Sequence, residues 1–199
     1  MSRLILILGG VRSGKSRFGL ELAARLGGDN VLFVATAAAG DDEMARRIAV
    51  HRQSRPAGWP TLEQALDVGA ALADVGSRHA VVLLDCLTLL VSNRLLASGD
   101  RPCAETAERD VRAEIDSLIS YASQFHGTII VVSGEVGMGL VPENPLGRLF
   151  RDLLGWANQR LAAAADETYL MVAGLPIELK ALANATVGRI SNLAEKPDN

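Results

Sequence analysis

The sequence predicts an α/β fold: a phosphate-loop nucleotide-binding domain, whose mostly parallel sheet is flanked by helices and carries one antiparallel hairpin at an edge. Short apolar runs alternate with amphipathic helical patterns along the chain, which is typical of a parallel sheet covered on both faces. A glycine-rich loop directly follows the first apolar run. Such a loop occupies this place in nucleotide-binding domains of the same class.

Composition favours one domain. The chain has 199 residues, of which 49% are hydrophobic and 4% aromatic, so its core is built from Leu, Val, Ile and Ala. We expect a single domain over residues 1–180 and a flexible tail over residues 181–199, where the pattern fades into Asn, Ser, Lys, Pro and Asp. The two cysteines, Cys86 and Cys103, form neither a disulfide framework nor a metal-binding spacing.

The first apolar run, Leu4–Leu8, predicts a strand, and Lys15–Leu26 predicts a helix that stops at Gly27 and Gly28. Between them the residues match the G-x-x-x-x-G-K-S phosphate loop: Gly9, Gly10, Val11, Arg12, Ser13, Gly14, Lys15 and Ser16. Glycines allow the backbone N–H groups to surround phosphates, and the following helix directs its positive end at the same anion. Lys15 would reach the outer phosphates and Ser16 would bind Mg²⁺. Because a predicted strand precedes the motif and a predicted helix follows it, chance explains the match poorly.

Four more apolar runs predict strands at Val31–Ala35, Ala80–Leu84, Thr128–Val132 and Thr168–Ala173. Helical periodicity predicts a long helix near residues 104–125, and Asn144-Pro145 marks the start of another. A short segment, Ile177–Lys180, follows the last of these strands after three residues. A connection that short permits only an antiparallel pair.

Ligands of open parallel sheets bind outside the carboxyl ends of the strands. The phosphate loop, Ala35–Ala37, Asp85 and residues 133–135 all fall at such ends. Asp85 ends an apolar run, where nucleotide-binding sheets place a carboxylate for Mg²⁺. It could instead cap a helix that begins at Leu87.

The same rule separates the three histidines. His79 and His126 precede predicted strands and therefore lie at the amino edge, whereas His51 lies beyond a carboxyl end, on a predicted helix opened by residues 41–43. Arg47 and Arg55 stand four residues to either side of it, on one helical face. Two guanidinium groups disfavour the imidazolium and keep a neutral, nucleophilic nitrogen available. A solvated surface histidine is the competing interpretation.

A loop with two glycines, residues 135–142, lies at the same edge and could approach a substrate with its backbone or serve as a plain connection. Here the match to a known family becomes specific. Over about residues 3–180 the chain resembles the bifunctional adenosylcobinamide kinase / adenosylcobinamide-phosphate guanylyltransferases of cobalamin biosynthesis. The residues that carry the resemblance are the phosphate loop, Ala35-Thr36, Asp41-Asp42-Glu43-Met44 with Arg47-Ile48 and His51, Arg55-Pro56 with Trp59, Glu135 to Asn144, and Asn158 to Glu167.

The resemblance implies two reactions. A nucleoside triphosphate, ATP or GTP, phosphorylates the aminopropanol hydroxyl of adenosylcobinamide. GTP then guanylylates a histidine, which corresponds to His51, and adenosylcobinamide phosphate takes up the GMP to give adenosylcobinamide-GDP. The family's nucleotide contacts fall on the phosphate loop, Ala35, Thr36, Ala37, Arg52, Gln53, Ser54, Arg55, Glu63 and Asp85. The family often has Glu at the position of Asp85, and the tail after Lys180 has no recognised counterpart.

Two alternatives remain open: a monofunctional small-molecule kinase with the same phosphate loop, and a nucleotide-dependent regulatory module. The net charge of -3 offers no basic surface for nucleic acid. The first strand begins too early for a signal peptide, and no apolar run approaches the roughly 20 residues of a membrane helix. We therefore expect a cytoplasmic enzyme that forms a homo-oligomer, binds small-molecule substrates and requires Mg²⁺.

Overall fold

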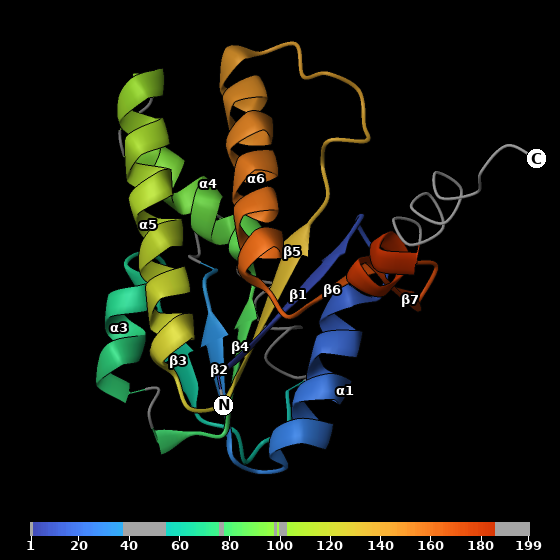
Figure 1. Cartoon of the computed structure of the whole chain (residues 1–199). Helices are drawn as coiled ribbons and strands as arrows, with labels where there is room; N and C mark the ends of the chain where they lie inside the picture. Colours follow the sequence, from blue (N-terminus) through green and yellow to red (C-terminus); the bar gives the residue numbers. More distant parts are fainter. Residues whose placement is uncertain (1, 38–54, 76–77, 98, 100–102, 186–199) are drawn as a thin grey trace, which may run out of the picture.

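The structure is a computed structural model that describes residues 2–37, 55–75, 78–97, 99 and 103–185. Within these residues, strands join into one sheet in the order β3-β2-β4-β5-β1-β6-β7, and only the β6–β7 pair is antiparallel (Figure 1). The strands are β1 (Arg3–Gly9), β2 (Val31–Ala35), β3 (Thr61–Glu63), β4 (Val81–Asp85), β5 (Thr128–Gly134), β6 (Glu167–Val172) and β7 (Leu175–Glu178).

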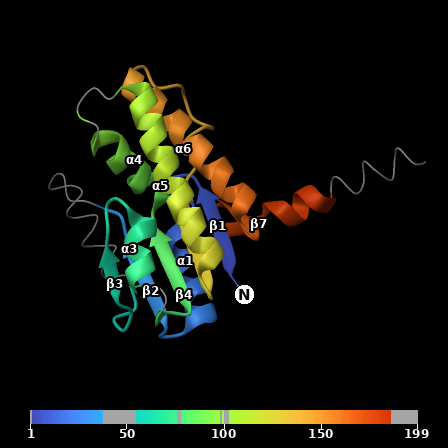
Figure 2. The same ribbon diagram turned by 60° about the vertical axis from the view of Figure 1, so that its left-hand side comes forward.

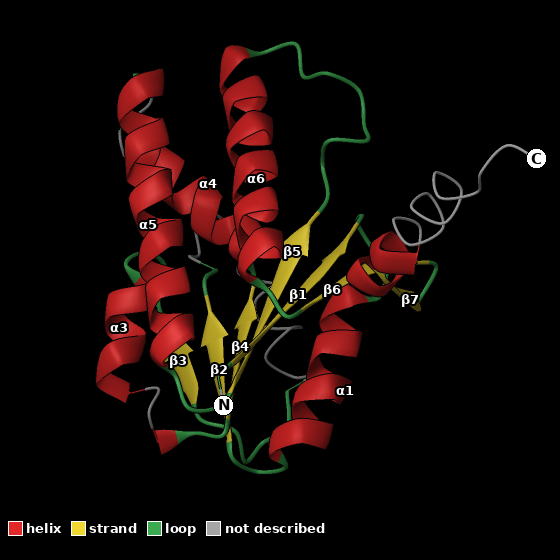
Figure 3. Ribbon diagram, in the orientation of Figure 1, coloured by secondary structure: helices red, strands yellow, loops and turns green. Residues whose placement is uncertain are grey.

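Helices cover both faces of this sheet. On one face lie α3 (Val68–Val75), α4 (Leu87–Ala97), α5 (Ala104–Gln124) and α6 (Pro145–Ala164); on the other lies α1 (Lys15–Gly27). Figure 1 shows the layers edge-on, with α5 on one side of the strands and α1 on the other; Figure 2 brings the α5 side forward, and Figure 3 shows the helices around the strands. Residues 179–185, which follow β7, are also helical.

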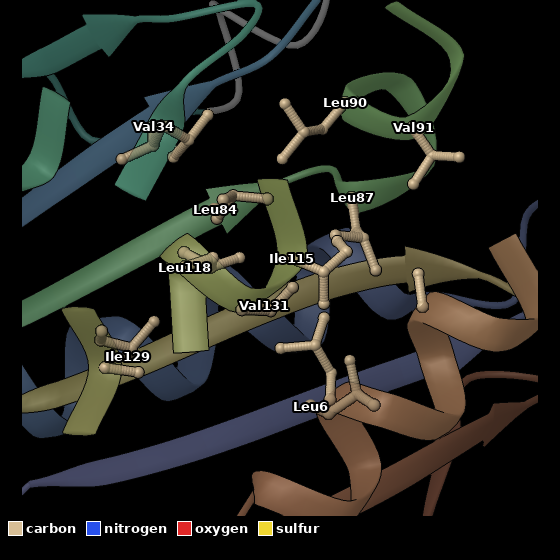
Figure 4. Close-up of a cluster of buried hydrophobic side chains, with 14 of the residues drawn as sticks. Leu6, Val34, Leu84, Leu87, Leu90, Val91, Ile115, Leu118, Ile129 and Val131 are labelled. Atoms are coloured by element: carbon tan, nitrogen blue, oxygen red, sulfur yellow. The ribbon is translucent and has the colours of Figure 1, made fainter. Parts of the chain in front are cut away.

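Alternation along the strands builds two cores. In β1, Leu4, Leu6 and Leu8 face α3–α6, whereas Ile5 and Ile7 face α1, because successive side chains of a strand point to opposite faces. Figure 4 shows the larger core, in which side chains from four strands meet α4 and α5. Both faces of the central strands are therefore apolar, as parallel sheets require.

One buried charge joins the helices of this larger core. The Glu114 carboxylate, on α5, accepts hydrogen bonds from the backbone N–H groups of Asp67 (2.9 Å) and Val68 (2.8 Å) at the start of α3. It also pairs with Arg94 of α4. The Glu114 side chain is only 2% exposed. Three helices are thus linked through one carboxylate that satisfies the first N–H groups of α3.

The predicted fold class is confirmed, with differences in detail. The five predicted parallel strands and the antiparallel hairpin are present, and His79 and His126 precede β4 and β5 at the amino edge, as predicted. The sequence did not predict β3, α3 or the length of α4. The predicted helix opened by residues 41–43, and residues 186–199 of the predicted tail, lie outside the described residues.

Strand order separates Asp85 from the phosphate loop by one strand. Because β5 lies between β1 and β4, Asp85 does not end the strand next to β1. Chain order does not fix strand order, because the helical crossovers are long enough to let a later strand enter between two earlier ones.

Among the described residues, no helix is long and apolar enough to cross a lipid bilayer.

We expect Glu114→Ala to destabilise the protein by about 3 kcal/mol, because it leaves two backbone N–H groups without their acceptor and removes the buried partner of Arg94, which keeps only the exposed Asp67 carboxylate. Glu108→Ala removes an exposed partner of Arg112 on the same helix and serves as the matched control, with an expected cost below about 1 kcal/mol. Urea unfolding of both variants measures the two values. Equal losses would show that the buried carboxylate does not join the helices in this way.

Candidate active site

The phosphate loop joins β1 to α1 in the conformation that its glycines permit. Gly14 has a φ of 95° and Arg12 a φ of 56°, and the Ser13 N–H donates to the Gly10 carbonyl at 3.3 Å. The Lys15 Nζ donates to the same carbonyl at 3.1 Å, so the ammonium lies over the loop. Val11, at the tip, is 93% exposed. The loop is therefore an open turn with its cation held above it, at the first turn of α1.

The hairpin of β6 and β7, at the edge of the sheet, contacts the phosphate loop through its turn. The Gly174 N–H, in the turn between β6 and β7, donates to the Ser13 carbonyl at 3.0 Å. A Cβ on Gly14 would lie 3.2 Å from the Gly174 Cα. A Cβ on Gly9 would overlap the Ser13 Oγ and lie 3.0 Å from the Met171 Cβ. Close backbone approach thus requires glycine at both positions.

Three predicted nucleotide contacts form one row across neighbouring strands. Glu63 of β3 is in register with Ala35 of β2, and Ala35 with Asp85 of β4. Residues in register on adjacent strands point to the same face of a sheet. Ala35 belongs to the α1-side core, so the row lies on the α1 side. The structure therefore brings together residues that are 28 and 22 positions apart in the sequence.

The Lys15 ammonium of the phosphate loop and the Asp85 carboxylate at the end of β4 both act on Cys86. Burial and, to a smaller extent, the Asp85 carboxylate raise the pKa of the Cys86 thiol to about 11, and the Lys15 ammonium acts in the opposite direction. Asp85 and Lys15 thus both lie within electrostatic reach of this thiol, although β5 separates their strands. The thiol is protonated at neutral pH and does not act as a nucleophile.

The carboxyl end of β2 is tied to β4 and α4. The Thr36 hydroxyl donates to the Cys86 carbonyl at 2.7 Å and accepts from the Cys86 N–H at 2.9 Å. The Asn93 side chain, on α4, donates to the carbonyls of Thr36 (2.7 Å) and Ala65 (3.1 Å). Thr36 is fully buried. Thr36 is a predicted nucleotide contact, and in this structure its hydroxyl joins the ends of β2 and β4.

A second amide fixes the end of β5. The Ser133 hydroxyl donates to the Asn158 Oδ1 at 2.7 Å, and the Asn158 Nδ2 donates to the Gly134 carbonyl at 3.1 Å. The Gly134 N–H donates to the Thr88 Oγ1 at 2.6 Å. The next N–H, of Glu135, donates to the Gly9 carbonyl at 3.0 Å. The end of β5 is therefore bonded to the first residue of the phosphate loop.

The glycine loop after β5 leaves the sheet at this point and rises beside α6 (Figure 1). Two arginines of α6 bond to its backbone: Arg151 donates to the Gly137 carbonyl at 2.7 Å, and Arg148 to the Pro142 carbonyl at 3.1 Å. The Asn144 side chain caps α6 by accepting from the Gly147 N–H at 2.6 Å, as the sequence predicts. The loop exposes three apolar side chains: Met138, Leu140 and Val141.

A cavity of about 490 Å³ adjoins the far end of the row. It is lined by Arg55, Trp59 and Glu63, among others. The Arg55 guanidinium lies 3.9 Å from the centre of the Phe33 ring, a cation–π distance. The Trp59 Nε1 donates to the Gly28 carbonyl at 3.0 Å, which fixes one wall. The cavity extends along β3, from Trp59 and Thr61 at its amino end to Glu63 at its carboxyl end, and offers a cation and a carboxylate.

The described part of the chain therefore gathers the phosphate loop, Ala35–Ala37, Glu63 and Asp85 at one edge, and Arg55 lies over Phe33 in the middle of β2. His51, Arg52, Gln53 and Ser54 lie outside the described residues. Sequence reasoning assigned no role to Thr88, Asn93, Asn158 or Gly174, although Asn158 is one of the residues that carry the family resemblance. The three polar side chains lie on helices opposite strand ends, and a single sequence carries no signal of that pairing.

We expect Gly9→Ala to weaken nucleotide binding by at least tenfold, because the new methyl group must displace Ser13 and distort the phosphate loop. Gly155→Ala is the matched control, since a Cβ at Gly155 meets no atom within 4 Å and Ala favours the helix. Titration with a fluorescent GTP analogue measures both. Unchanged affinity in Gly9→Ala would mean that the loop adopts another conformation when nucleotide binds.

Comparisons with known proteins identify the family of the chain. The family model described as cobinamide kinase / cobinamide phosphate guanyltransferase matches residues 5–179. The bifunctional adenosylcobalamin biosynthesis protein CobU of Escherichia coli is 43% identical over 89% of this chain and 99% of its own length. The protein of that name from Salmonella typhimurium is 45% identical, with the same coverage of both chains.

The bifunctional adenosylcobalamin biosynthesis protein CobP of Pseudomonas aeruginosa is 45% identical over 88% of this chain and 96% of its own. Among solved structures, the ATPase domain of G40P aligns with a TM-score of 0.43 and 14% identity over 85% of this chain and 69% of that one. This distant likeness adds nothing to the assignment. On the match to the family model and to three relatives along almost their whole length, the chain belongs to the cobinamide kinase / cobinamide phosphate guanyltransferase family.

Proposed function

We propose that the chain is a bifunctional enzyme of cobalamin biosynthesis that phosphorylates adenosylcobinamide and then transfers GMP from GTP to the product, giving adenosylcobinamide-GDP. One observation carries the proposal: the family match spans residues 5–179, and so includes both the phosphate loop and the segment with His51. The open loop with Lys15 over it supports a triphosphate-binding role.

In the first reaction, the aminopropanol hydroxyl oxygen attacks the γ-phosphorus of the nucleoside triphosphate. The bond to the bridging oxygen breaks, the nucleoside diphosphate leaves, and the hydroxyl proton is lost. Phosphoryl transfer of this kind depends mostly on positioning and on neutralising charge. The backbone N–H groups of the loop, the start of α1 and the Lys15 ammonium supply that neutralisation.

In the second reaction, a neutral imidazole nitrogen of His51 attacks the α-phosphorus of GTP, and pyrophosphate leaves. A phosphate oxygen of adenosylcobinamide phosphate then attacks the same phosphorus. The phosphorus–nitrogen bond breaks, which frees the histidine and forms adenosylcobinamide-GDP. Arg47 and Arg55, four positions either side of His51 in the sequence, would keep the imidazole neutral and contact phosphates.

The row of Glu63, Ala35 and Asp85 supports a nucleotide that lies along the sheet edge. The row starts on β4, two strands from β1, and runs to β3, four strands from β1. Adjacent strands are about 4.8 Å apart, so β1 and β2 are separated by about 14 Å. A triphosphate held at the loop could therefore direct its nucleoside towards Ala35–Ala37, Arg52–Arg55, Glu63 and the cavity beside it.

Mg²⁺ fits the donors present. Ser16 stands in the first turn of α1 and Asp85 at the end of β4, and the shared influence of Lys15 and Asp85 on Cys86 indicates that loop and carboxylate are near one another. Mg²⁺ usually binds through one or two protein groups, water and substrate phosphates. Ser16 and Asp85 would hold it, and the ion would supply positive charge between the phosphates. We also propose that the enzyme works in the cytoplasm, as a homo-oligomer.

Lys15→Ala should lower both reactions by on the order of 10²-fold, because it removes a charge that stabilises the transferring phosphates. The assay follows adenosylcobinamide phosphorylation and GMP transfer in one preparation, with Lys180→Ala as the control for a lysine far along the chain. Full activity in a folded Lys15→Ala variant would contradict the assignment of the phosphate loop.

His51→Ala should abolish the covalent GMP adduct formed from α-labelled GTP, while some phosphorylation of adenosylcobinamide remains, because only the second reaction needs a nucleophile from the protein. His126→Ala is the matched control, since His126 is exposed and precedes β5 at the opposite edge. The adduct should be labile to acid and stable to alkali. If the native protein forms no adduct but phosphorylates the substrate, it is a monofunctional kinase.

A further inference from the structure

The loop between β5 and α6 presents an apolar surface to solvent. Met138 is 83% exposed, Leu140 95% and Val141 66%, whereas Val136, nearer to β5, packs against the larger core. Met138, Leu140 and Val141 together are called the apolar tip below. Apolar side chains that gather on one exposed segment mark an interaction site, and methionine adapts its shape to an irregular partner. The loop therefore offers a binding surface.

A glycine in the middle of the apolar tip points to the same use. Gly139 stands between Met138 and Leu140. A Cβ on Gly139 would meet only the Val136 carbonyl, at 3.8 Å, which is an ordinary contact distance, and Gly139 is not among the described glycines with a positive φ. Neither crowding nor backbone conformation within the described residues therefore requires glycine here. Glycine also lets a ligand approach the backbone closely.

The loop begins beside the phosphate loop and lies on the α6 side of the sheet edge. The Glu135 N–H donates to the Gly9 carbonyl at 3.0 Å, so the two loops leave the sheet at neighbouring points. The bond from Arg151 of α6 to the Gly137 carbonyl then holds the loop beside α6 (Figure 1). The row of predicted nucleotide contacts that includes Ala35 lies on the α1 side instead.

The geometry of phosphoryl transfer gives these two sides different roles. The attacking and leaving oxygens lie roughly in line, on opposite sides of the phosphorus. In the proposed function the nucleoside extends from the phosphate loop towards the row on the α1 side, so the acceptor hydroxyl must approach from another direction. The turn between β6 and β7 packs against Gly14, which obstructs approach along β6. Approach from the α6 side, past the apolar tip, remains.

We propose that the apolar tip and Gly139 bind the corrin macrocycle of the acceptor, adenosylcobinamide in the first reaction and its phosphate in the second, so that the aminopropanol arm reaches the phosphate loop. This inference rests on the proposed function. The rim of a corrin ring carries methyl groups and amide side chains, which suit apolar side chains and an uncovered glycine backbone. A second copy of the chain fits less well, because a stable protein interface takes about 20–30 residues from each partner and the apolar tip offers three.

Leu140→Gln tests the proposal without disturbing the core, because Leu140 is exposed. We expect the KM for adenosylcobinamide in phosphorylation, and for adenosylcobinamide phosphate in GMP transfer, to rise about 10-fold, while kcat stays within about threefold. The rate of adduct formation from α-labelled GTP alone should stay unchanged, because no corrinoid takes part in that step. Leu140→Met restores an apolar side chain and should recover most of the affinity. Leu96→Gln, at an exposed leucine near the end of α4, is the matched control.

Gly139→Ala is an independent test of the backbone contact, with Gly155→Ala as its control, since a Cβ at Gly155 also meets open space. It should raise the same two KM values and leave adduct formation unchanged. Native KM values in both Leu140→Gln and Gly139→Ala, or an equal loss of adduct formation, would overturn the inference. So would KM values that recover at high protein concentration together with weaker self-association in sedimentation, which would assign the apolar tip to an interface between copies. A native protein that neither phosphorylates adenosylcobinamide nor forms the adduct would instead overturn the proposed function.

Discussion

Parallel pairing with both faces buried is the constraint on which the rest of this structure depends. The central strands β1, β5, β4 and β2 carry apolar side chains on both sides, so they can lie only between layers of helices. Parallel strands also place every carboxyl end at one edge. Gly9, Gly134, Asp85 and Ala35 therefore end neighbouring strands. The site is a consequence of how the core is covered.

The sequence predicts the long, strongly patterned elements well and the short ones poorly. The runs at Leu4–Leu8 and Val31–Ala35 are apolar throughout, and α6 has both a cap and an apolar stripe. By contrast, β3 has three residues, with exposed Thr61 and Glu63, and owes its state to pairing with β2. The order of the strands in the sheet could not be predicted either, because periodicity indicates which residues are buried and not which strands are neighbours.

The same distinction applies to the candidate site: features that are local in the sequence could be predicted, and contacts between distant segments could not. The phosphate loop is local in sequence, so its motif is sufficient to find it, and the carboxyl-end rule finds Asp85. Bonds between distant segments are not visible in one sequence: Asn158 to Ser133, Asn93 to Thr36, and Gly174 to Ser13 each join residues more than twenty positions apart. The chemical assignment of His51 rested on topology and on family resemblance, and it stays a prediction.

The turn between β6 and β7 bears on how this protein can be altered. Exposed hairpin turns are usually the places where a chain tolerates an inserted peptide or a new pair of termini. Here the turn is at the outer edge of the sheet, yet the Gly174 N–H is bonded to Ser13, and its Cα leaves no room for a side chain on Gly14. An insertion at this turn would change the shape of the phosphate loop. For labelling or fusion, the outermost hairpin is therefore as sensitive as the phosphate loop that it contacts.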